Sequence, residues 1–454
     1  MASPWNYTAM PARYTASTYW PPARSLRRVP CRNRPGHWWT PCTDPFMPHP
    51  SQRGHGSMSQ RFDLNTESRT LRRRLVRTMQ QGLSELGPQP LVTNTSLYTD
   101  PERHAAEHEF VFRRTPLVVG LSRDVPEPGN TLLFDAYGPP VIVVRQEDGG
   151  LAAFRNFCPH RGGQLQASRS KQGGLLCPFH GWRFDQKGHL THRPLGEAFD
   201  QTRKTSLEPV AVAERHGLLF IQHETTEDEL DLRGFLGAID RLLEAFQLDR
   251  AEPVGHDTLE VEANWKLVVD ISCEGYHVPA THPKSLSPQL VPFLTIHDHF
   301  GLHHRFASPG RDLQRLVDLR ESEWPPSGTG YSAVHYLFPN TILTVSAAID
   351  GELPVIAINR SFPTRDIGVT RVVYSSYRPM DAPPVPASAY AKLHAAIVNI
   401  NRDEDLPTVA GAWRNYASLR EPAPLVFGRN EMLLQRYHGD IADACGIPLP
   451  ITAA

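Results

Sequence analysis

The sequence predicts an α+β protein in which a small all-β domain precedes a larger mixed domain. From residue 110 to about 225, short runs rich in β-branched and aromatic residues alternate with Gly, Pro and Asp turns. Such alternation is typical of a compact all-β domain. Residues 226–454 then mix strand-like runs with helical stretches, so we expect a second domain that contains both kinds of element.

Hydrophobic periodicity places the individual elements. Leucines and a methionine recur at spacings of three and four over 67–90, which predicts a helix within an N-terminal segment, 58–109, that packs on the larger domain. In the larger domain, the same signal predicts helices over 226–250 and 387–418. The predicted strands are 131–134, 141–144, 151–154 and 217–222 in the small domain, and 342–346 and 370–374 in the larger one.

Composition excludes several classes of function. The chain has 454 residues, 40% hydrophobic and 21% charged, with a formal net charge of −1. This balance gives no indication of a nucleic acid or anionic membrane partner. No apolar run reaches about 18 residues, so we expect no membrane anchor. Six cysteines in so long a chain do not form a disulfide framework, and we expect a reducing, cytoplasmic location.

The first 57 residues differ from the rest. They contain ten prolines, seven arginines and a single acidic residue, Asp44, and show no hydrophobic periodicity. We therefore expect disorder. Three interpretations stay open: translated upstream sequence with Met58 as the true start, an arginine-rich transit peptide, or a functional arm.

Two short motifs combine cysteine and histidine. The motif Cys158-Pro-His160-Arg-Gly is followed by Cys177-Pro-Phe-His180-Gly-Trp, with sixteen residues between His160 and Cys177. Two thiolates and two imidazoles on paired turns can hold a [2Fe–2S] cluster in which cysteines bind one iron and histidines the other. A structural zinc site accepts the same ligands, but zinc fingers usually group the cysteines together and the histidines together.

These motifs resemble the Rieske signature of ring-hydroxylating, non-haem iron oxygenase α subunits. The flanking segments 125–156 and 183–188 are also similar to that family, and the similarity runs from about residue 110 to the C-terminus. The resemblance implies a Rieske [2Fe–2S] domain at 110–225. It also implies a catalytic domain at 226–454, built on an antiparallel sheet with helices in a helix-grip-like arrangement, that holds mononuclear Fe(II).

A second constellation lies in the larger domain, around Glu274-Gly-Tyr-His277 and His282. Apolar residues from Trp265 onward predict a buried helix that Pro279 ends or kinks. On such a helix Glu274 and His277 share a face. The chain can then turn back to offer His282 to the same ion, which suits a site of two histidines and one carboxylate with open positions for O₂.

The resemblance assigns the roles. His277 and His282 take the positions of the family's iron histidines, and the third ligand is expected at Asp405, with Asp403 as the alternative. Glu274 takes the position of an acid that links the iron site of one subunit to the Rieske histidine of its neighbour, here His180. With a glutamate at this position, the chain resembles the branch of the family that contains carnitine and choline oxygenases.

Asp270 lies one helical turn before Glu274 and is a second candidate for supporting the iron site. The substrate pocket is expected between about 285 and 380, near aromatic residues such as Phe293, Phe300 and Tyr336.

The implied activity is O₂-dependent hydroxylation or dihydroxylation of a small organic, preferably aromatic, substrate. The sequence has no Gly-x-Gly-x-x-Gly fingerprint, so a separate reductase or ferredoxin must supply electrons from NAD(P)H. The resemblance implies a homotrimer or an α₃β₃ assembly. Demethylation and quaternary-ammonium monooxygenation stay open within the family. A Rieske electron carrier without oxygenase activity, or a zinc-binding structural protein, is the alternative outside it.

Overall fold

The computed structural model describes residues 63–167, 174–199, 206–225, 229–324, 331–347, 353–380 and 382–451. The predicted N-terminal extension, 1–57, and Met58 lie outside these residues. None of the described helices has the length and hydrophobicity that crossing a membrane requires.

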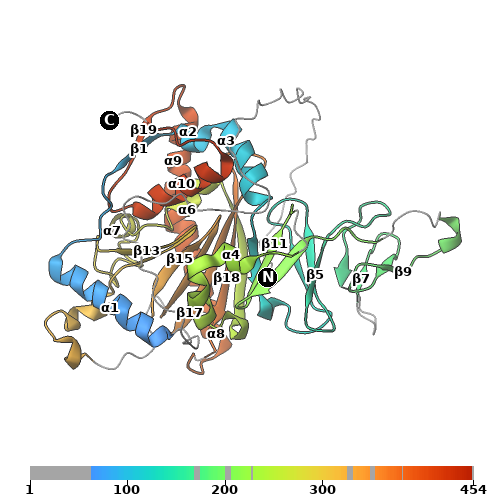
Figure 1. Ribbon diagram of the computed structural model, residues 1–454, viewed down its shortest axis with the longest axis horizontal. Coiled ribbons are helices and arrows are strands. Elements are labelled where there is room, and N and C mark those ends of the chain that lie inside the picture. Colours follow the sequence, from blue (N-terminus) through green and yellow to red (C-terminus); the bar gives the residue numbers. More distant parts are fainter. Residues whose placement is uncertain are drawn as a thin grey trace, which may run out of the picture. The chain divides into compact units, whose positions relative to one another are not determined.

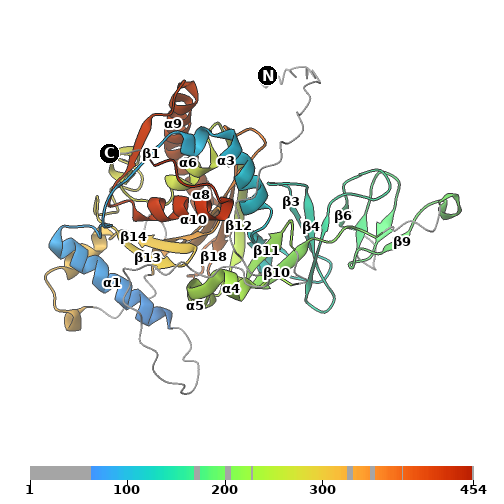
Figure 2. The same cartoon turned by 45° about the horizontal axis from the view of Figure 1, so that its top comes forward.

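The small domain is all-β, as predicted. Its described residues form three antiparallel sheets with the orders β10-β11-β2, β3-β4-β5 and β6-β7-β8-β9. Figures 1 and 2 both show β6–β9 at the end of the domain that points away from the large sheet. Its strands are β2 (Leu117–Leu121), β3 (Thr131–Phe134), β4 (Val141–Arg145), β5 (Leu151–Arg155), β6 (Gln166–Ala167), β7 (Leu175–Leu176), β8 (Arg183–Phe184), β9 (Leu190–His192), β10 (Ala211–Arg215) and β11 (Leu218–Gln222).

The larger domain is built on a seven-stranded antiparallel sheet of order β12-β18-β17-β16-β15-β14-β13. Because side chains alternate between the two faces of a strand, neighbouring residues enter different cores. Ile342 packs with Trp265 and Tyr437, whereas Leu343 packs with Leu236 and the helices beside it. The strands are β12 (Glu252–Val261), β13 (Ile296–Phe300), β14 (His303–Ala307), β15 (Ala333–Leu337), β16 (Thr341–Ala347), β17 (Pro354–Pro363) and β18 (Thr370–Arg378).

Helices cover both faces of this sheet (Figure 1). A two-stranded sheet of β1 (Leu91–Asn94) and β19 (Pro424–Phe427) joins the N-terminal segment to the C-terminal one. The helices are α1 (Leu64–Gln81), α2 (Ser96–Thr99), α3 (Pro101–Ala106), α4 (Leu232–Leu236), α5 (Asp240–Ala245), α6 (Trp265–Asp270), α7 (Val278–Thr281), α8 (Ala387–Ile400), α9 (Leu406–Ser418) and α10 (Met432–Cys445), with π-helical turns at Glu107–Phe112 and Asn401–Asp405.

Helix α1 is shorter than predicted. It ends at Gln81 because Gly82 adopts a left-handed cap and donates to the carbonyl of Met79. The next two leucines of the periodic pattern, Leu83 and Leu86, are exposed. Their spacing extended the predicted helix to residue 90, but in the structure these two side chains do not pack against a core.

The predicted helix around Glu274 is wrong in extent. Helix α6 ends at Asp270, and the residues up to His277 form turns. Pro279 does not end a helix but lies in the first turn of α7. Backbone N–H groups in the first turn have no acceptor within the helix, so proline costs no hydrogen bond there. Pro407 likewise begins α9 and does not interrupt the predicted helical stretch.

A buried ion pair connects the N-terminal segment to α6. Lys266 and Glu107 are both fully buried and bonded to each other, and the Trp265 indole donates to Glu107 at 2.7 Å. Removing one partner leaves an uncompensated charge, so we expect Lys266→Met to lower the free energy of unfolding by about 3–5 kcal/mol. The midpoint of urea denaturation measures this loss.

The double variant Lys266→Met/Glu107→Gln serves as the control, because it removes both charges. It should recover part of the lost stability. A single variant that unfolds at the wild-type urea concentration would contradict the prediction.

Candidate metal centres and substrate cavity

The two cysteine–histidine motifs form matching loops at the tip of the small domain. In the first, Cys158 N–H donates to Gly163 and Gly162 N–H donates back to Cys158. In the second, Cys177 N–H donates to the carbonyl of Trp182, and Gly181 N–H donates to the carbonyl of Cys177. Gly162 and Gly181 have φ values of 75° and 73°, a region in which other residues are strained. The two loops therefore present their side chains in equivalent ways.

The four side chains of these loops fit a [2Fe–2S] cluster. Both cysteines are buried and free, and the imidazoles of His160 and His180 lie 4.4 Å apart, centroid to centroid. The Nδ1 atoms of both histidines are buried and have no hydrogen-bond partner among the described residues. Burial, and then the neighbouring Cys177, raise the pKa of the Cys158 thiol to about 11. Because a metal binds the thiolate form of cysteine, a cation held between these two side chains would offset the cost of burying that charge.

The second constellation brings three potential ligands together in the larger domain. His282 Nε2 lies 2.9 Å from Asp405 Oδ1, and His277 Nε2 lies 3.7 Å from the same oxygen. One donor atom from each of the three residues lies within 4.8 Å of the others. Asp405 Oδ1 is buried and has no hydrogen-bond partner among the described residues. Lone pairs that converge in this way fit a divalent metal ion, and an open triad suits Fe(II).

Local structure explains why Asp405, and not Asp403, reaches the histidines. The π-helical turn Asn401–Asp405 joins α8 to α9. Its extra residue per turn rotates the following side chains relative to an α-helix. Asp405 is buried beside the histidines, while Asp403 is exposed and pairs with Arg402 at 2.7 Å.

Glu404 was missed by the sequence analysis. Its carboxylate lies 2.7 Å from His282 Nδ1 and accepts from Ser285 Oγ at 2.7 Å. Burial by itself lowers the pKa of His282, but Asp405 and Glu404 outweigh it and raise that pKa. An acceptor on the outer nitrogen fixes which imidazole nitrogen faces the metal. Nothing in the spacing of the sequence connects Glu404 to a histidine 122 positions earlier.

We expect Glu404→Gln to weaken Fe(II) binding by roughly 10–100-fold, as is typical when such an acceptor is lost. Titration of apoprotein with Fe(II) under anaerobic conditions measures the effect. Ser285→Ala is the matched control, because it removes only the hydroxyl that donates to the same carboxylate. An equal loss in both variants would argue against direct orientation of His282 by Glu404.

Glu274 contacts His277 although no helix carries the pair. Its Oε1 bonds to His277 Nδ1, and its Oε2 accepts from the backbone N–H groups of Tyr276 and His277. Asp270 has other partners: the Tyr98 hydroxyl at 2.6 Å and His438 Nε2 at 2.9 Å. The structure therefore gives no support for the predicted role of Asp270 beside the iron site.

A cavity of about 740 Å³ adjoins the triad and is lined by His277, His282 and Asp405 together with a mixture of aliphatic and polar side chains. This volume suits a small organic ligand. The predicted pocket region is partly correct, since segments 286–313 and 332–359 contribute. Phe293, Phe300 and Tyr336 do not line the cavity, however, and Phe306 is the one aromatic residue among the described lining residues.

Comparison with known proteins decides the family. The profile of the Rieske [2Fe-2S] domain matches residues 115–204, and that of the ring hydroxylating alpha subunit (catalytic domain) matches 248–447. The carnitine monooxygenase oxygenase subunit of Escherichia coli (strain K12) is 32% identical over 269 residues, which cover 57% of this chain and 68% of that protein. This chain belongs to the Rieske oxygenase α subunits. The predicted family, fold class and pair of cofactors are thus confirmed.

Other relatives of this Rieske oxygenase α subunit are named after different substrates. The glycine betaine monooxygenase oxygenase subunit of Chromohalobacter salexigens is 29% identical over 297 residues. The match spans 63% of each protein, less than two thirds of that relative's length. The chlorobenzene dioxygenase subunit alpha of Cupriavidus sp. (strain PS12) is 32% identical over 200 residues, 42% of this chain and 44% of that one.

Among solved structures, a quaternary ammonium Rieske monooxygenase in complex with L-carnitine shares the fold of this α subunit. The TM-score is 0.64 at 22% identity, and the match covers 78% of this chain and 95% of that one.

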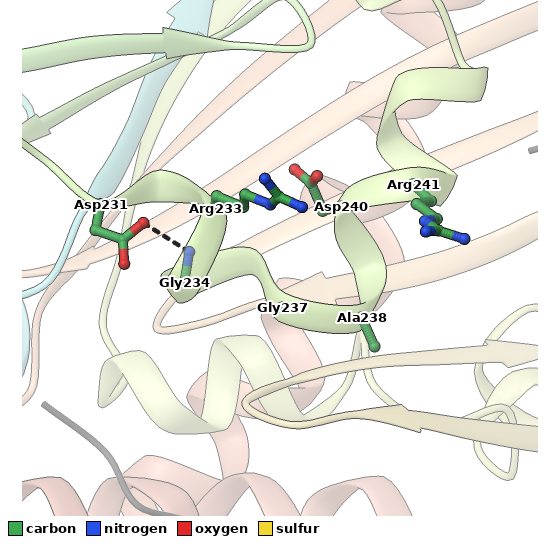
Figure 3. Close-up of a pocket in the computed structure, with 7 residues that line it drawn as sticks. All are labelled: Asp231, Arg233, Gly234, Gly237, Ala238, Asp240 and Arg241. Atoms are coloured by element: carbon green, nitrogen blue, oxygen red, sulfur yellow. Dashed lines mark hydrogen bonds between the residues drawn. The ribbon is translucent and has the colours of Figure 1, made fainter. Parts of the chain in front are cut away.

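A second hollow, of about 500 Å³, lies beside α4 and α5 (Figure 3). Its carboxylates are already engaged. Asp231 accepts from the N–H of Gly234 at 2.8 Å, and Asp240 pairs with Arg215 and with His216, the latter at 2.8 Å. We assign no ligand to this hollow.

Proposed function

We propose that the chain is the oxygenase component of a multicomponent enzyme that oxidises a small organic molecule with O₂. A separate reductase or ferredoxin would deliver the electrons. The proximity of His277, His282 and Asp405, which all line the cavity, supports the proposal, since a metal ion bound there would adjoin space for a substrate. The match to the catalytic-domain profile favours this function over that of a simple electron carrier.

In this proposal Cys158 and Cys177 hold one iron of the cluster, and His160 and His180 hold the other. The mononuclear iron is held by His277, His282 and Asp405. When bound, the cluster supplies single electrons and the mononuclear iron supplies the site at which O₂ is activated. Free, buried cysteines suit a reducing compartment such as the cytoplasm.

The residues of the chain orient these groups and connect them. Glu274 accepts at His277 Nδ1 and so fixes the tautomer that faces the metal. Figure 1 draws α7 far from β7 and β9, with the large sheet between them. We therefore propose that Glu274 receives the electron from His180 of a second copy of this chain, in a homotrimer or α₃β₃ assembly.

Exposed aromatic residues support this docking. Tyr276, two residues after Glu274, and Phe293 are 59% and 58% exposed, and their ring centroids lie 5.8 Å apart. On the Rieske loops, Phe157 and Phe179 are 62% and 54% exposed. Exposed apolar clusters of this kind mark interaction surfaces. We propose that the two clusters face each other between copies.

We propose a quaternary ammonium compound as the first candidate substrate, because relatives named for glycine betaine and carnitine match this chain and Glu274 resembles that branch. A permanent cation often binds in an aromatic cage. Phe306 is the only Phe, Tyr or Trp among the described lining residues, so they form no aromatic cage. We therefore keep a second candidate, an apolar or aromatic compound, which the chlorobenzene dioxygenase relative suggests.

Metal analysis of anaerobically purified protein tests the proposal. About three irons and two acid-labile sulfides per chain are expected when both sites are filled. About two irons with two sulfides would remove the mononuclear site, and zinc without sulfide would overturn the proposal. Oxygen uptake with glycine betaine, L-carnitine and chlorobenzene, in the presence of a reductase, separates the substrate candidates.

A further inference from the structure

The N-terminal helix α1 forms one wall of the cavity. Ser68, Leu71, Arg72 and Leu75 all line it. Their spacing of three and four residues places them on a single face of the helix. The substrate cavity therefore includes a segment that lies more than 200 residues before the first iron histidine.

Ion pairs hold this wall against the catalytic domain. On α1, Glu67 pairs with Arg305 at 2.7 Å and Arg74 pairs with Asp298 at 2.6 Å. The helix contacts β13 and the 3₁₀ turn Arg311–Leu316, and Figure 1 shows α1 beside that turn. Side chains on its inner face thus have fixed positions relative to the cavity.

Two polar groups on this inner face lack partners. Ser68 is 3% exposed, and its hydroxyl has no hydrogen bond within the part of the chain that the structure describes. Arg72 is half-buried and forms no hydrogen bond or ion pair with the described residues, whereas the neighbouring Arg73 and Arg74 are both paired. A buried polar group without a partner is costly and is rare unless it has a ligand.

Resting on the proposed function, we infer that Ser68 and Arg72 bind a carboxylate group of the substrate. The Ser68 hydroxyl and the Arg72 guanidinium, four residues apart on one helix face, can both donate to one carboxylate. Leu71 and Leu75, from the same face, contact the adjoining hydrocarbon. Arg311 and Asp312 are exposed and also line the cavity, so their opposite charges offset each other and Arg72 is the cation on which the inference rests. The substrate class is then a carboxylate with an alkyl portion, and α1 recognises its acidic end.

Binding of hexanoate and of hexanamide to the metal-loaded protein tests this inference. The two probes have equal chain lengths, and only hexanoate carries a charge. A charge-assisted hydrogen bond contributes about 1.5–3 kcal/mol, so calorimetry should show hexanoate binding roughly 10–100-fold more tightly than hexanamide. Arg72→Gln should bring the two affinities to within a few-fold, Arg72→Lys should keep part of the preference, and Ser68→Ala should reduce it several-fold.

Arg77→Gln is the matched control, because Arg77 lies on the same helix, is exposed and does not line the cavity. Iron and sulfide content verifies that each variant is folded. Equal affinity of wild-type protein for the two probes, or the same preference in Arg72→Gln and Arg77→Gln, overturns the inference. Failure of the proposed function looks different, since mononuclear iron or oxygen uptake is then missing while the carboxylate preference persists.

Discussion

Replacing Asp405 with alanine is expected to lower the iron content from about three to about two atoms per chain, while two sulfides and the visible absorption of the cluster persist. Asp405 contributes the one oxygen that faces both His277 and His282, at 3.7 Å and 2.9 Å. Two imidazoles alone hold Fe(II) weakly. Because a catalytic metal supplies several kcal/mol of stabilisation, product formation should fall by roughly 10³-fold or more.

The neighbouring acid provides the control for this experiment. Asp403 is exposed and pairs with Arg402, so Asp403→Asn should keep the full iron content and most of the activity. Loss of one iron in Asp403→Asn, with retention in Asp405→Ala, would reverse the assignment. Metal analysis and the cluster spectrum of both proteins, purified in parallel, distinguish these outcomes.

Glu274→Gln is expected to keep both metal sites and the oligomer but to slow turnover by about 10–100-fold or more, the usual effect of removing an acceptor behind a metal-bound histidine. The carboxylate accepts from His277 and from two backbone N–H groups. An amide has one acceptor oxygen and cannot also accept from an imidazole of a second subunit. Stopped-flow re-oxidation of the reduced cluster by O₂ measures the step that should slow.

Asp270→Asn distinguishes the role of Asp270 from that of Glu274, since the sequence predicts that both acids support the iron site. Asp270 bonds to Tyr98 and His438, so this change should affect stability and leave the rate of cluster re-oxidation close to that of the wild type. Unchanged turnover in Glu274→Gln, with the oligomer intact by sedimentation, would exclude the proposed route through Glu274.

The sequence by itself determined the family and the two domain types, and it predicted six of the seven proposed metal ligands without offering an alternative residue. It did so because these features are local. Each Rieske loop contributes its ligands within four residues, and His277 and His282 are five positions apart. Strand predictions in the small domain, such as 131–134, also succeeded, because alternation over a few residues depends on one turn and one buried face.

Only the tertiary structure brings Asp405, and not Asp403, to the two histidines, places Glu404 beside His282, and makes α1 a wall of the cavity. The choice of acid depends on a π-helical turn that no local periodicity predicts. Glu404 meets His282, and Ser68 and Arg72 meet the cavity, through packing of segments more than 100 residues apart. Hydrophobic spacing indicates which face of a helix is buried. What that face is buried against depends on the rest of the fold.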